Sequence, residues 1–217
     1  MNFSEAAGCV VMAVTAYLLG SIPTGYLVAR AKGIDIRTVG SGNMGATNVF
    51  RVLGKTAGAI VLIIDGLKGY AACAWLAIFL ANQFSVPAAQ QECFKILAGV
   101  AAVLGHNYTC WLKFKGGKGV ATSAGVFFAL APLAAGIALA AWIFVFALSR
   151  YASVASIVAA IALSGAVWLT ENNLILQLVT TALALLAIIK HKENIKRLLN
   201  GTERRFGKKS ETQEVAK

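Results

Sequence analysis

Long apolar runs separated by short polar segments dominate the chain. About 20 apolar residues cross a hydrocarbon core about 30 Å thick. Runs of this kind cover residues 6–30, 57–81, 94–112, 151–169 and 174–189. The run from Val120 to Leu148 is too long for one simple crossing, and Pro132, which lacks an amide donor, predicts a break into two shorter helices. The pattern predicts an all-α fold, a polytopic transmembrane helix bundle of about seven spans that includes shorter broken helices.

Composition supports a membrane protein over a soluble one. Hydrophobic residues make up 58% of the 217 residues and charged residues only 13%, whereas soluble domains carry about 25% charged residues. The excess apolar surface needs lipid. We expect a single integral membrane domain over residues 1–206. The polar residues 207–217 lack periodicity and predict a flexible C-terminal tail.

Basic residues fall on one predicted side of the membrane. That side receives Arg30, Lys32, Arg37, Arg51, Lys55, Lys113, Lys115, Lys118, Arg150 and the segment 190–205. The positive-inside rule makes it cytoplasmic, so the N-terminus lies outside and the C-terminus inside. The formal net charge of +11 does not indicate nucleic acid, because these residues lie between and after apolar runs. An anionic leaflet and anionic substrates account for it better.

The first polar loop, VGSGNMGATNVFR, has the composition of an oxyanion site. Glycines at 40, 42 and 45 let backbone amides approach an anion, and Arg51 offers a bidentate fork for phosphate. Side-chain donors are Ser41, Asn43, Thr47 and Asn48. The alternative is an ordinary loop, since glycine, serine and asparagine are common in turns.

The second polar loop interleaves lysines with glycines. Its sequence contains Lys113, Lys115, Gly116, Gly117, Lys118 and Gly119. A helix predicted to begin at Val120 would present amides and a positive dipole to an anion. The spacing differs from G-x-x-x-x-G-K-[ST], which excludes ATP binding. Positive-inside topology alone would also explain the lysines.

Five further polar side chains near the apolar runs are candidates. Asp65 and Lys68 are three residues apart on one helix face, which predicts an intramembrane ion pair with a bracing or supporting role. His106 is a lone membrane histidine, of a kind that is more often structural than catalytic. His191 and Asn194 lie one turn apart beyond the final span. Because zinc, hydrolase and C-x-x-C motifs are absent from the sequence, we expect no metal and no cofactor.

Motifs spread over nearly the whole chain carry a family resemblance. They are GSIPTGY, GSGNMGATNVFR, DGLKG, GHNYTCWLKFKGGKGVAT, RYASVASI and KHKENIKRLLNGTE. In order and spacing this chain resembles the bacterial acyl-phosphate:glycerol-3-phosphate acyltransferase family. Two positions depart from the common pattern: Thr109 stands where relatives often have proline, and Lys190 where they often have arginine.

The resemblance implies transfer of a fatty acyl group from long-chain acyl phosphate to the 1-hydroxyl of glycerol 3-phosphate. The products would be lysophosphatidic acid and inorganic phosphate, at the entry to phospholipid synthesis. It also implies the bacterial cytoplasmic (inner) membrane, contact with membrane lipids, an active site near the cytoplasmic face, and functional coupling to the enzyme that makes acyl phosphate.

The expected site draws on both loops and the last polar segment. Expected catalytic residues are His191, Asn194, Ser41 and Lys118. Expected substrate-binding residues are Ser41, Asn43, Thr47, Asn48, Arg51, Lys68, His106, Lys115, Gly116, Gly117, Lys118, His191 and Asn194. We expect one phosphate near Arg51 and Lys118 and the acyl tail between helices. Direct attack by the glycerol hydroxyl needs a proton acceptor, either His191 or the substrate phosphate.

Two other classes of function compete with the enzyme. A transporter for an anionic metabolite would also use broken helices and helix N-termini, and a structural scaffold is the third alternative. The sequence has no convincing inverted repeat, which favours the enzyme.

Overall fold

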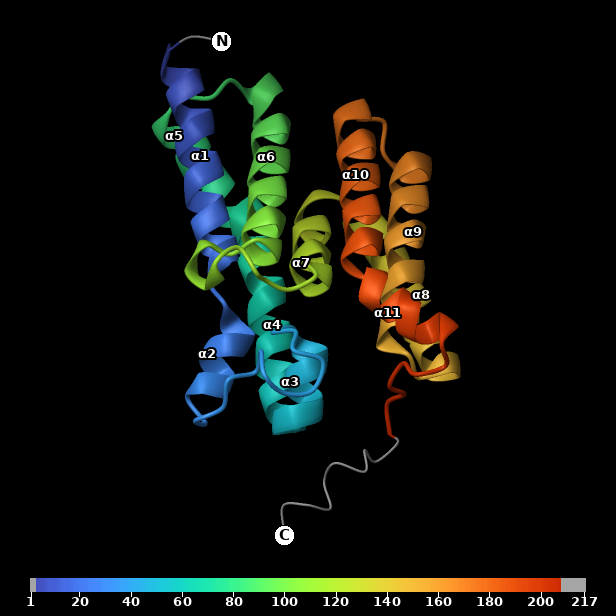
Figure 1. Ribbon diagram of the computed structural model, residues 1–217. Coiled ribbons are helices and arrows are strands. Elements are labelled where there is room, and N and C mark those ends of the chain that lie inside the picture. Colours follow the sequence, from blue (N-terminus) through green and yellow to red (C-terminus); the bar gives the residue numbers. More distant parts are fainter. Residues whose placement is uncertain (1–2, 208–217) are drawn as a thin grey trace.

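The computed structural model describes residues 3–207, and these fold into helices and connecting loops. The prediction of a flexible tail over 207–217 therefore lies, apart from Gly207, outside the described residues. In chain order (Figure 1) the elements are α1 (Phe3–Ser21), α2 (Thr24–Arg30), α3 (Ala46–Leu53), α4 (Lys55–Ala71), a π-helical turn η1 (Ala72–Leu76), α5 (Ala77–Gln83), α6 (Ala88–Asn107), a 3-10 turn η2 (Cys110–Leu112), α7 (Val120–Leu130), α8 (Pro132–Ser149), α9 (Ala152–Thr170), α10 (Leu174–Lys190) and α11 (Lys192–Leu199).

Four described segments are long and apolar enough to cross a membrane. They are Ser4–Arg30, Lys55–Gln83, Pro132–Ser149 and Ala152–Thr170. A fifth arises if α10 and α11, bent by 52°, form one span. The all-α membrane fold is confirmed, while seven spans and an outside N-terminus remain predictions.

The break expected at Pro132 is confirmed. Helix α7 ends at Leu130, and α8 begins with Pro132 in its first turn. Proline is tolerated there because a first-turn amide has no partner within its helix. One expected boundary is wrong: α6 begins at Ala88 and ends at Asn107, rather than covering 94–112. Polar residues at a helix end do not interrupt it, so the apolar run alone placed the start too late.

Glycine allows α4 and α7 to pack closely. A Cβ at Gly125 would collide with the backbone oxygen of Gly66 on α4. Small residues at such contacts are typical of membrane helices, which associate by close packing. Figure 1 shows α1, α5 and α6 on one side and α8, α9 and α10 on the other, with α7 between them.

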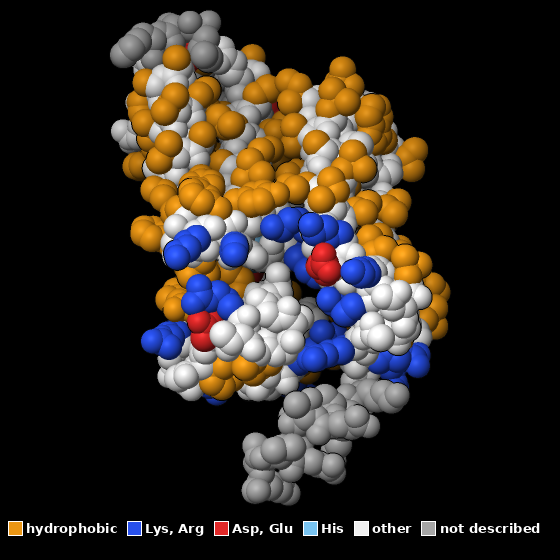
Figure 2. Space-filling model, viewed as in Figure 1, with side chains coloured by type: hydrophobic (Ala, Val, Ile, Leu, Met, Phe, Trp, Pro, Cys, Tyr) orange, Lys and Arg blue, Asp and Glu red, His pale blue; other side chains and the backbone are white. Residues whose placement is uncertain are grey.

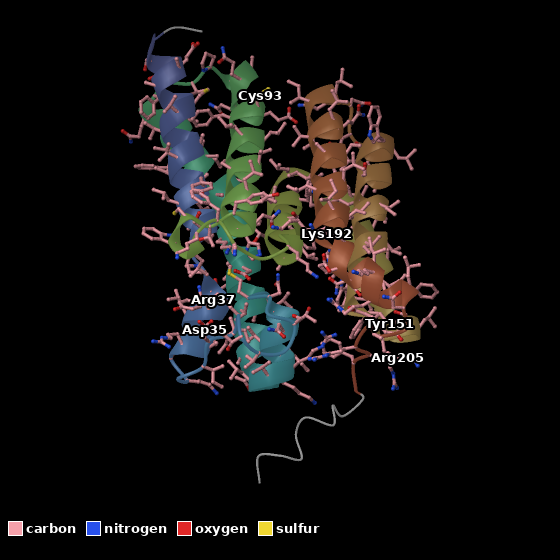
Figure 3. The ribbon with its side chains drawn as sticks, in the orientation of Figure 1. Asp35, Arg37, Cys93, Tyr151, Lys192 and Arg205 are labelled. Carbon is pink, nitrogen blue, oxygen red and sulfur yellow. The ribbon has the colours of Figure 1, made fainter. Side chains whose placement is uncertain are left out.

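Charge separates along the molecule. Figure 2 shows hydrophobic side chains over the upper part, and lysine and arginine side chains gathered in the lower half. In Figure 3, Arg37 and Arg205 lie toward this basic end, and Cys93 lies toward the opposite end. Exposed apolar side chains such as Leu67, Phe144 and Ile161 belong to the long helices. This distribution fits a protein surrounded by lipid, with one basic end in contact with water.

Candidate active site

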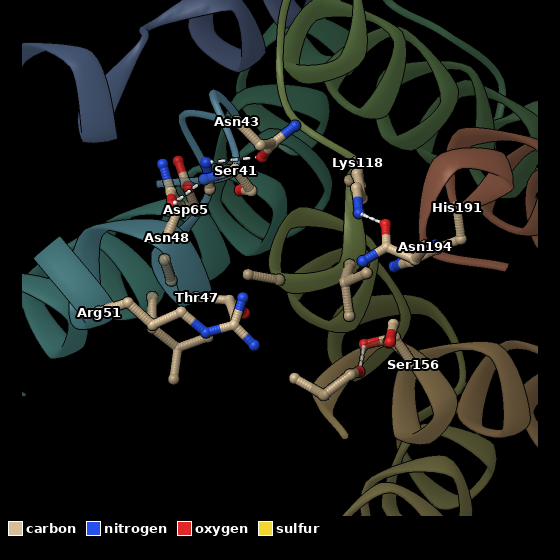
Figure 4. A pocket seen from close by; sticks show the side chains of 18 of the residues that line it. Ser41, Asn43, Thr47, Asn48, Arg51, Asp65, Lys118, Ser156, His191 and Asn194 are labelled. Atoms are coloured by element: carbon tan, nitrogen blue, oxygen red, sulfur yellow. Dashed lines mark hydrogen bonds between the residues drawn. The ribbon is translucent and has the colours of Figure 1, made fainter. Parts of the chain in front are cut away.

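A polar cavity of about 140 Å³ lies between the α3–α4 side and the segments from α7 to α11. Figure 4 shows side chains from both sides facing it. Its polar lining consists of Ser41, Asn43, Thr47, Asn48, Arg51, Asp65, His106, Lys118, Ser153, Ser156, His191, Asn194 and Glu203. The fold therefore brings together the first loop, the second loop and the last polar segment, as the sequence predicted.

Two asparagines shape the first loop. The Oδ1 of buried Asn48 accepts a hydrogen bond from the Ser41 amide at 2.8 Å, and its Nδ2 donates to the Val39 carbonyl at 3.1 Å. The Oδ1 of Asn43 accepts from the Gly45 amide at 2.8 Å, just before α3 begins. Both side chains are thus bonded to the backbone of their own loop. Their geometry supports the loop that carries Ser41 and leads to Thr47 and Arg51 on α3.

The second loop folds back onto the end of α6. The Gly117 amide donates to the His106 carbonyl at 3.0 Å, and the Gly116 amide donates to the Asn107 carbonyl at 3.2 Å. A Cβ at Gly117 would collide with Nε2 of His106. The structure therefore corrects the expectation that Lys115, Gly116 and Gly117 bind substrate. All three residues lie outside the cavity lining, and the amides of the two glycines are already hydrogen-bonded to the backbone.

This packing brings Lys118 and the start of α7 to the cavity. The Lys118 ammonium donates to Oδ1 of Asn194 on α11. Burial lowers the pKa of Lys118 to about 8; Arg197 and Arg51 add to that shift, and Glu203 opposes it. Lys118 is therefore a cation at neutral pH, with a proton that alkaline solution removes.

His191 lies at the junction of α10 and α11. Its Nδ1 is 2.7 Å from the Ala187 carbonyl oxygen. A carbonyl can only accept, so Nδ1 carries the hydrogen and Nε2 keeps a lone pair. Burial lowers the pKa of His191 to about 4, with a further contribution from Lys118. The ring is neutral at physiological pH, as a hydrogen-bond acceptor or base must be.

Glu203 organises the wall formed by α9 and α11. Its buried carboxylate accepts hydrogen bonds from Ser153 at 2.9 Å, from Asn194 at 2.7 Å and from Nε of Arg197 at 2.7 Å. Burial acts to raise the pKa of Glu203, but these hydrogen bonds outweigh it and the pKa is lowered. The carboxylate is therefore ionised and holds the Asn194 amide in one orientation.

Sequence reasoning missed Glu203, Ser153 and Ser156 as cavity residues. Glu203 stands in the LLNGTE motif, where an acidic residue between Arg197 and Arg204 was an available signal. The serines are three residues apart on the apolar helix α9, so they share a face. That spacing was a second available signal.

The intramembrane ion pair is confirmed. The Lys68 ammonium lies 2.8 Å from Oδ1 of Asp65, and both side chains are buried. Lys68 also donates to the Ile22 carbonyl at 3.0 Å, at the break between α1 and α2, and Thr24 donates to Asp65 at 3.0 Å. Lys68 does not line the cavity, so the structure places it as a brace rather than at the expected substrate contact. Asp65 lines the cavity and has His106 Nδ1 3.7 Å from its Oδ1.

An apolar cavity of about 200 Å³ adjoins the polar one. Side chains of α7, α8, α9 and α10 form most of its lining. Both cavities are lined by Leu62, Val120, Ala121, Trp142 and Ser156. A molecule with a polar head and a long apolar tail could thus occupy both at once.

Comparison with known proteins agrees with the predicted family. The family model described as glycerol-3-phosphate acyltransferase matches residues 10–201. A glycerol-3-phosphate acyltransferase of Geotalea daltonii is 48% identical, over 91% of this chain and 97% of the relative. One of Geobacter sulfurreducens is 46% identical, over 90% of this chain and 96% of the relative.

Two crystal structures of PlsY (YgiH), an integral membrane glycerol 3-phosphate acyltransferase, share the fold at 40% identity. The glycerol 3-phosphate form has a TM-score of 0.82 and covers 95% of this chain and 98% of that one. The lysophosphatidic acid form has a TM-score of 0.79 and covers 92% and 95%. The chain therefore belongs to the glycerol-3-phosphate acyltransferase family of integral membrane proteins.

Proposed function

We propose that this protein transfers a fatty acyl group from acyl phosphate to the 1-hydroxyl of glycerol 3-phosphate, yielding lysophosphatidic acid and inorganic phosphate. The observation that carries the proposal is the shared wall between a cationic polar cavity and an apolar cavity. Acyl transfer to a water-soluble phosphate ester requires both environments to meet at the reacting carbonyl. PlsY (YgiH), whose crystal structures include a glycerol 3-phosphate form and a lysophosphatidic acid form, has the same fold.

Glycerol 3-phosphate is assigned to the polar cavity. Arg51 and Lys118 supply positive charge there, and Ser41 and Thr47 supply hydroxyl groups. A guanidinium suits bidentate contact with phosphate, and an ammonium adds a point charge. Lys118 is hydrogen-bonded to Asn194 in the lining of this cavity, so a phosphate bound to Lys118 would lie beside Asn194.

The acyl chain is assigned to the apolar cavity. Its carbonyl would then lie at the shared wall, close to Val120 and Ala121 in the first turn of α7. First-turn amides have no partners within their own helix, and the helix dipole is positive at this end. Donors fixed in this way stabilise the oxyanion that develops as the carbonyl is attacked.

The reaction then needs no acyl-enzyme. The glycerol hydroxyl oxygen bonds to the acyl carbon, the bond from that carbon to phosphate breaks, and phosphate leaves with the electron pair. Holding both substrates in one site supplies much of the acceleration. Two acceptors are available for the hydroxyl proton: Nε2 of His191, and the phosphate of glycerol 3-phosphate. Asn194, fixed between Lys118 and Glu203, orients the groups around it.

The same reasoning favours a cytoplasmic active site in a bacterial inner membrane. The cavity is lined by residues of the basic segments, which the positive-inside rule assigns to the cytoplasm. Glycerol 3-phosphate is soluble in water, and acyl phosphate has a charged head group. The enzyme that makes acyl phosphate would deliver it from this side.

The test is a donor comparison with purified protein. Radiolabelled glycerol 3-phosphate is incubated with long-chain acyl phosphate, acyl-CoA or acyl carrier protein thioester, and lipid product is extracted. We expect product from acyl phosphate, loss of product in Lys118→Ala, and retention in Lys115→Ala, which changes an exposed lysine outside the cavity. If only a thioester gave product, acyl phosphate would be refuted as the donor. Uptake of glycerol 3-phosphate into sealed vesicles without chemical conversion would favour a transporter.

A further inference from the structure

The chain continues past α11 as a strap, residues 200–206, that contacts both sides of the polar cavity. The Phe206 amide donates to the Arg150 carbonyl at 2.9 Å, at the end of α8. The Arg204 carbonyl accepts from Nη2 of Arg51 on α3 at 2.9 Å. Figure 1 shows this segment below α11, at the basic end of the molecule. The strap thus links helices that are far apart in sequence.

One aromatic ring on the strap contacts three side chains. The Phe206 ring centroid is 5.2 Å from that of Phe50 on α3 and 5.2 Å from that of Phe146 on α8, at interplanar angles of 56° and 79°. The Cζ of Arg51 lies 5.1 Å from the same centroid. These are favourable tilted aromatic contacts and a cation–π contact. The ring therefore sits between α3 and α8 with Arg51 against it.

Strap contacts restrain the Arg51 guanidinium before substrate arrives. The Arg204 carbonyl accepts from one nitrogen and the Phe206 ring supports the group. A guanidinium has five N–H donors, so one bond to the strap leaves others for phosphate. An unrestrained arginine side chain loses much rotamer freedom when it binds an anion. Ordering it beforehand removes part of that cost from substrate binding.

The strap has a fixed anchor on the opposite wall. Glu203, one residue before Arg204, is buried and accepts hydrogen bonds from Ser153 and Asn194. Helices α9 and α11 therefore fix the position of the strap, and the strap in turn restrains Arg51 on α3. This arrangement couples the two walls of the cavity.

We propose that Phe206, which follows α11, is a positioning residue that orients the Arg51 guanidinium for the phosphate of glycerol 3-phosphate. The inference rests on the proposed function, since it assigns that phosphate to Arg51. Phe206 itself acts through Arg51 and touches no reacting atom. Affinity for glycerol 3-phosphate depends on it, and the chemical step does not.

The first test measures steady-state kinetics of full-length variants with both substrates. Phe206→Leu should raise KM and Kd for glycerol 3-phosphate about five-fold, with kcat and the KM for acyl phosphate unchanged. Phe206→Tyr keeps the ring and should behave as wild type. Arg205→Ala is the matched control on the strap, because Arg205 contacts Tyr151 and the Ser149 carbonyl instead. Unchanged affinity in folded Phe206→Leu would overturn the inference.

A double-mutant cycle separates positioning from packing. Phe206→Leu should cause no further loss of affinity in an Arg51→Ala background, whereas additive losses would show that the ring acts independently and would refute the proposal. If Phe206→Leu unfolds, Phe206→Met replaces it, because methionine keeps the apolar volume but lacks the ring. Wild-type affinity for glycerol 3-phosphate in Phe206→Met would also refute the proposal. Unchanged affinity in Arg51→Ala would instead reject the proposed phosphate site. A loss of affinity in Arg51→Ala without a loss in Phe206→Leu would reject only the role proposed for Phe206.

Discussion

The ammonium of Lys118 donates a hydrogen bond to the side-chain carbonyl of Asn194, 76 residues further along the chain. The amide nitrogen of Asn194 in turn donates to Glu203 at 2.7 Å. An ammonium only donates and a carboxylate only accepts, so the two contacts fix which way the Asn194 amide points. The side chain of Asn194 therefore joins the glycine-rich loop to α11.

Lys118 should set the alkaline limit of activity. Its pKa of about 8 means that the cation is present below pH 8 and lost above it, so kcat/KM should fall as pH rises through about 8. Lys118→Arg should move this limit upward, because arginine stays protonated. Lys118→Ala should lower kcat/KM about 100-fold. The measurement is a pH–rate profile with Lys115→Ala as control, and an unshifted limb in an active Lys118→Arg would contradict the assignment.

Asp65 should be required for stability. Asp65→Asn leaves the buried Lys68 ammonium without its counter-ion, which should cost about 3–5 kcal/mol in the free energy of unfolding. The double variant Asp65→Leu with Lys68→Leu should recover much of this loss, because no buried charge remains. Unfolding in detergent micelles would measure both. Asp35→Asn, which breaks a more exposed pair with Arg37, should leave stability unchanged; an equal loss there would argue against a special role for burial.

Gly117 should tolerate no side chain. A Cβ there would collide with Nε2 of His106, so Gly117→Ala must shift the loop that places Lys118. We expect activity to fall at least about ten-fold, with the protein still extracted as a folded membrane protein. Gly136→Ala is the control, because nothing lies within 4 Å of its added Cβ. Equal activities of the two variants would show that loop placement is not critical.

Ala138 should help to set the usable acyl length. It lines the apolar cavity on α8, one helical turn from Trp142 at the shared wall. Ala138→Phe should shorten the cavity and lower kcat/KM for long-chain relative to short-chain acyl phosphate at least about ten-fold. The adjacent Ile137→Phe changes an exposed side chain and should keep the wild-type ratio. Competition assays with two donors give that ratio directly, and an unaltered ratio in Ala138→Phe would remove this cavity as the acyl site.

Sequence by itself determined the features that depend on near neighbours along the chain. Apolar runs of membrane length predict the long helices, because backbone groups in lipid must bond within their own segment. Pro132 predicts the break that separates α7 from α8, and the spacing of Asp65 and Lys68 predicts their ion pair. The family and its site segments were also readable, because the motifs are contiguous.

Tertiary structure decided which groups face the cavity. Gly116 and Gly117 looked like anion-binding amides, but packing against α6 occupies both. Glu203 meets Ser153 across 50 residues, and no local pattern specifies such a pair. Helical period fixes the face on which a side chain lies; the packing of distant helices fixes what that face meets. Contacts between distant segments are therefore decided by the tertiary structure and not by the local sequence.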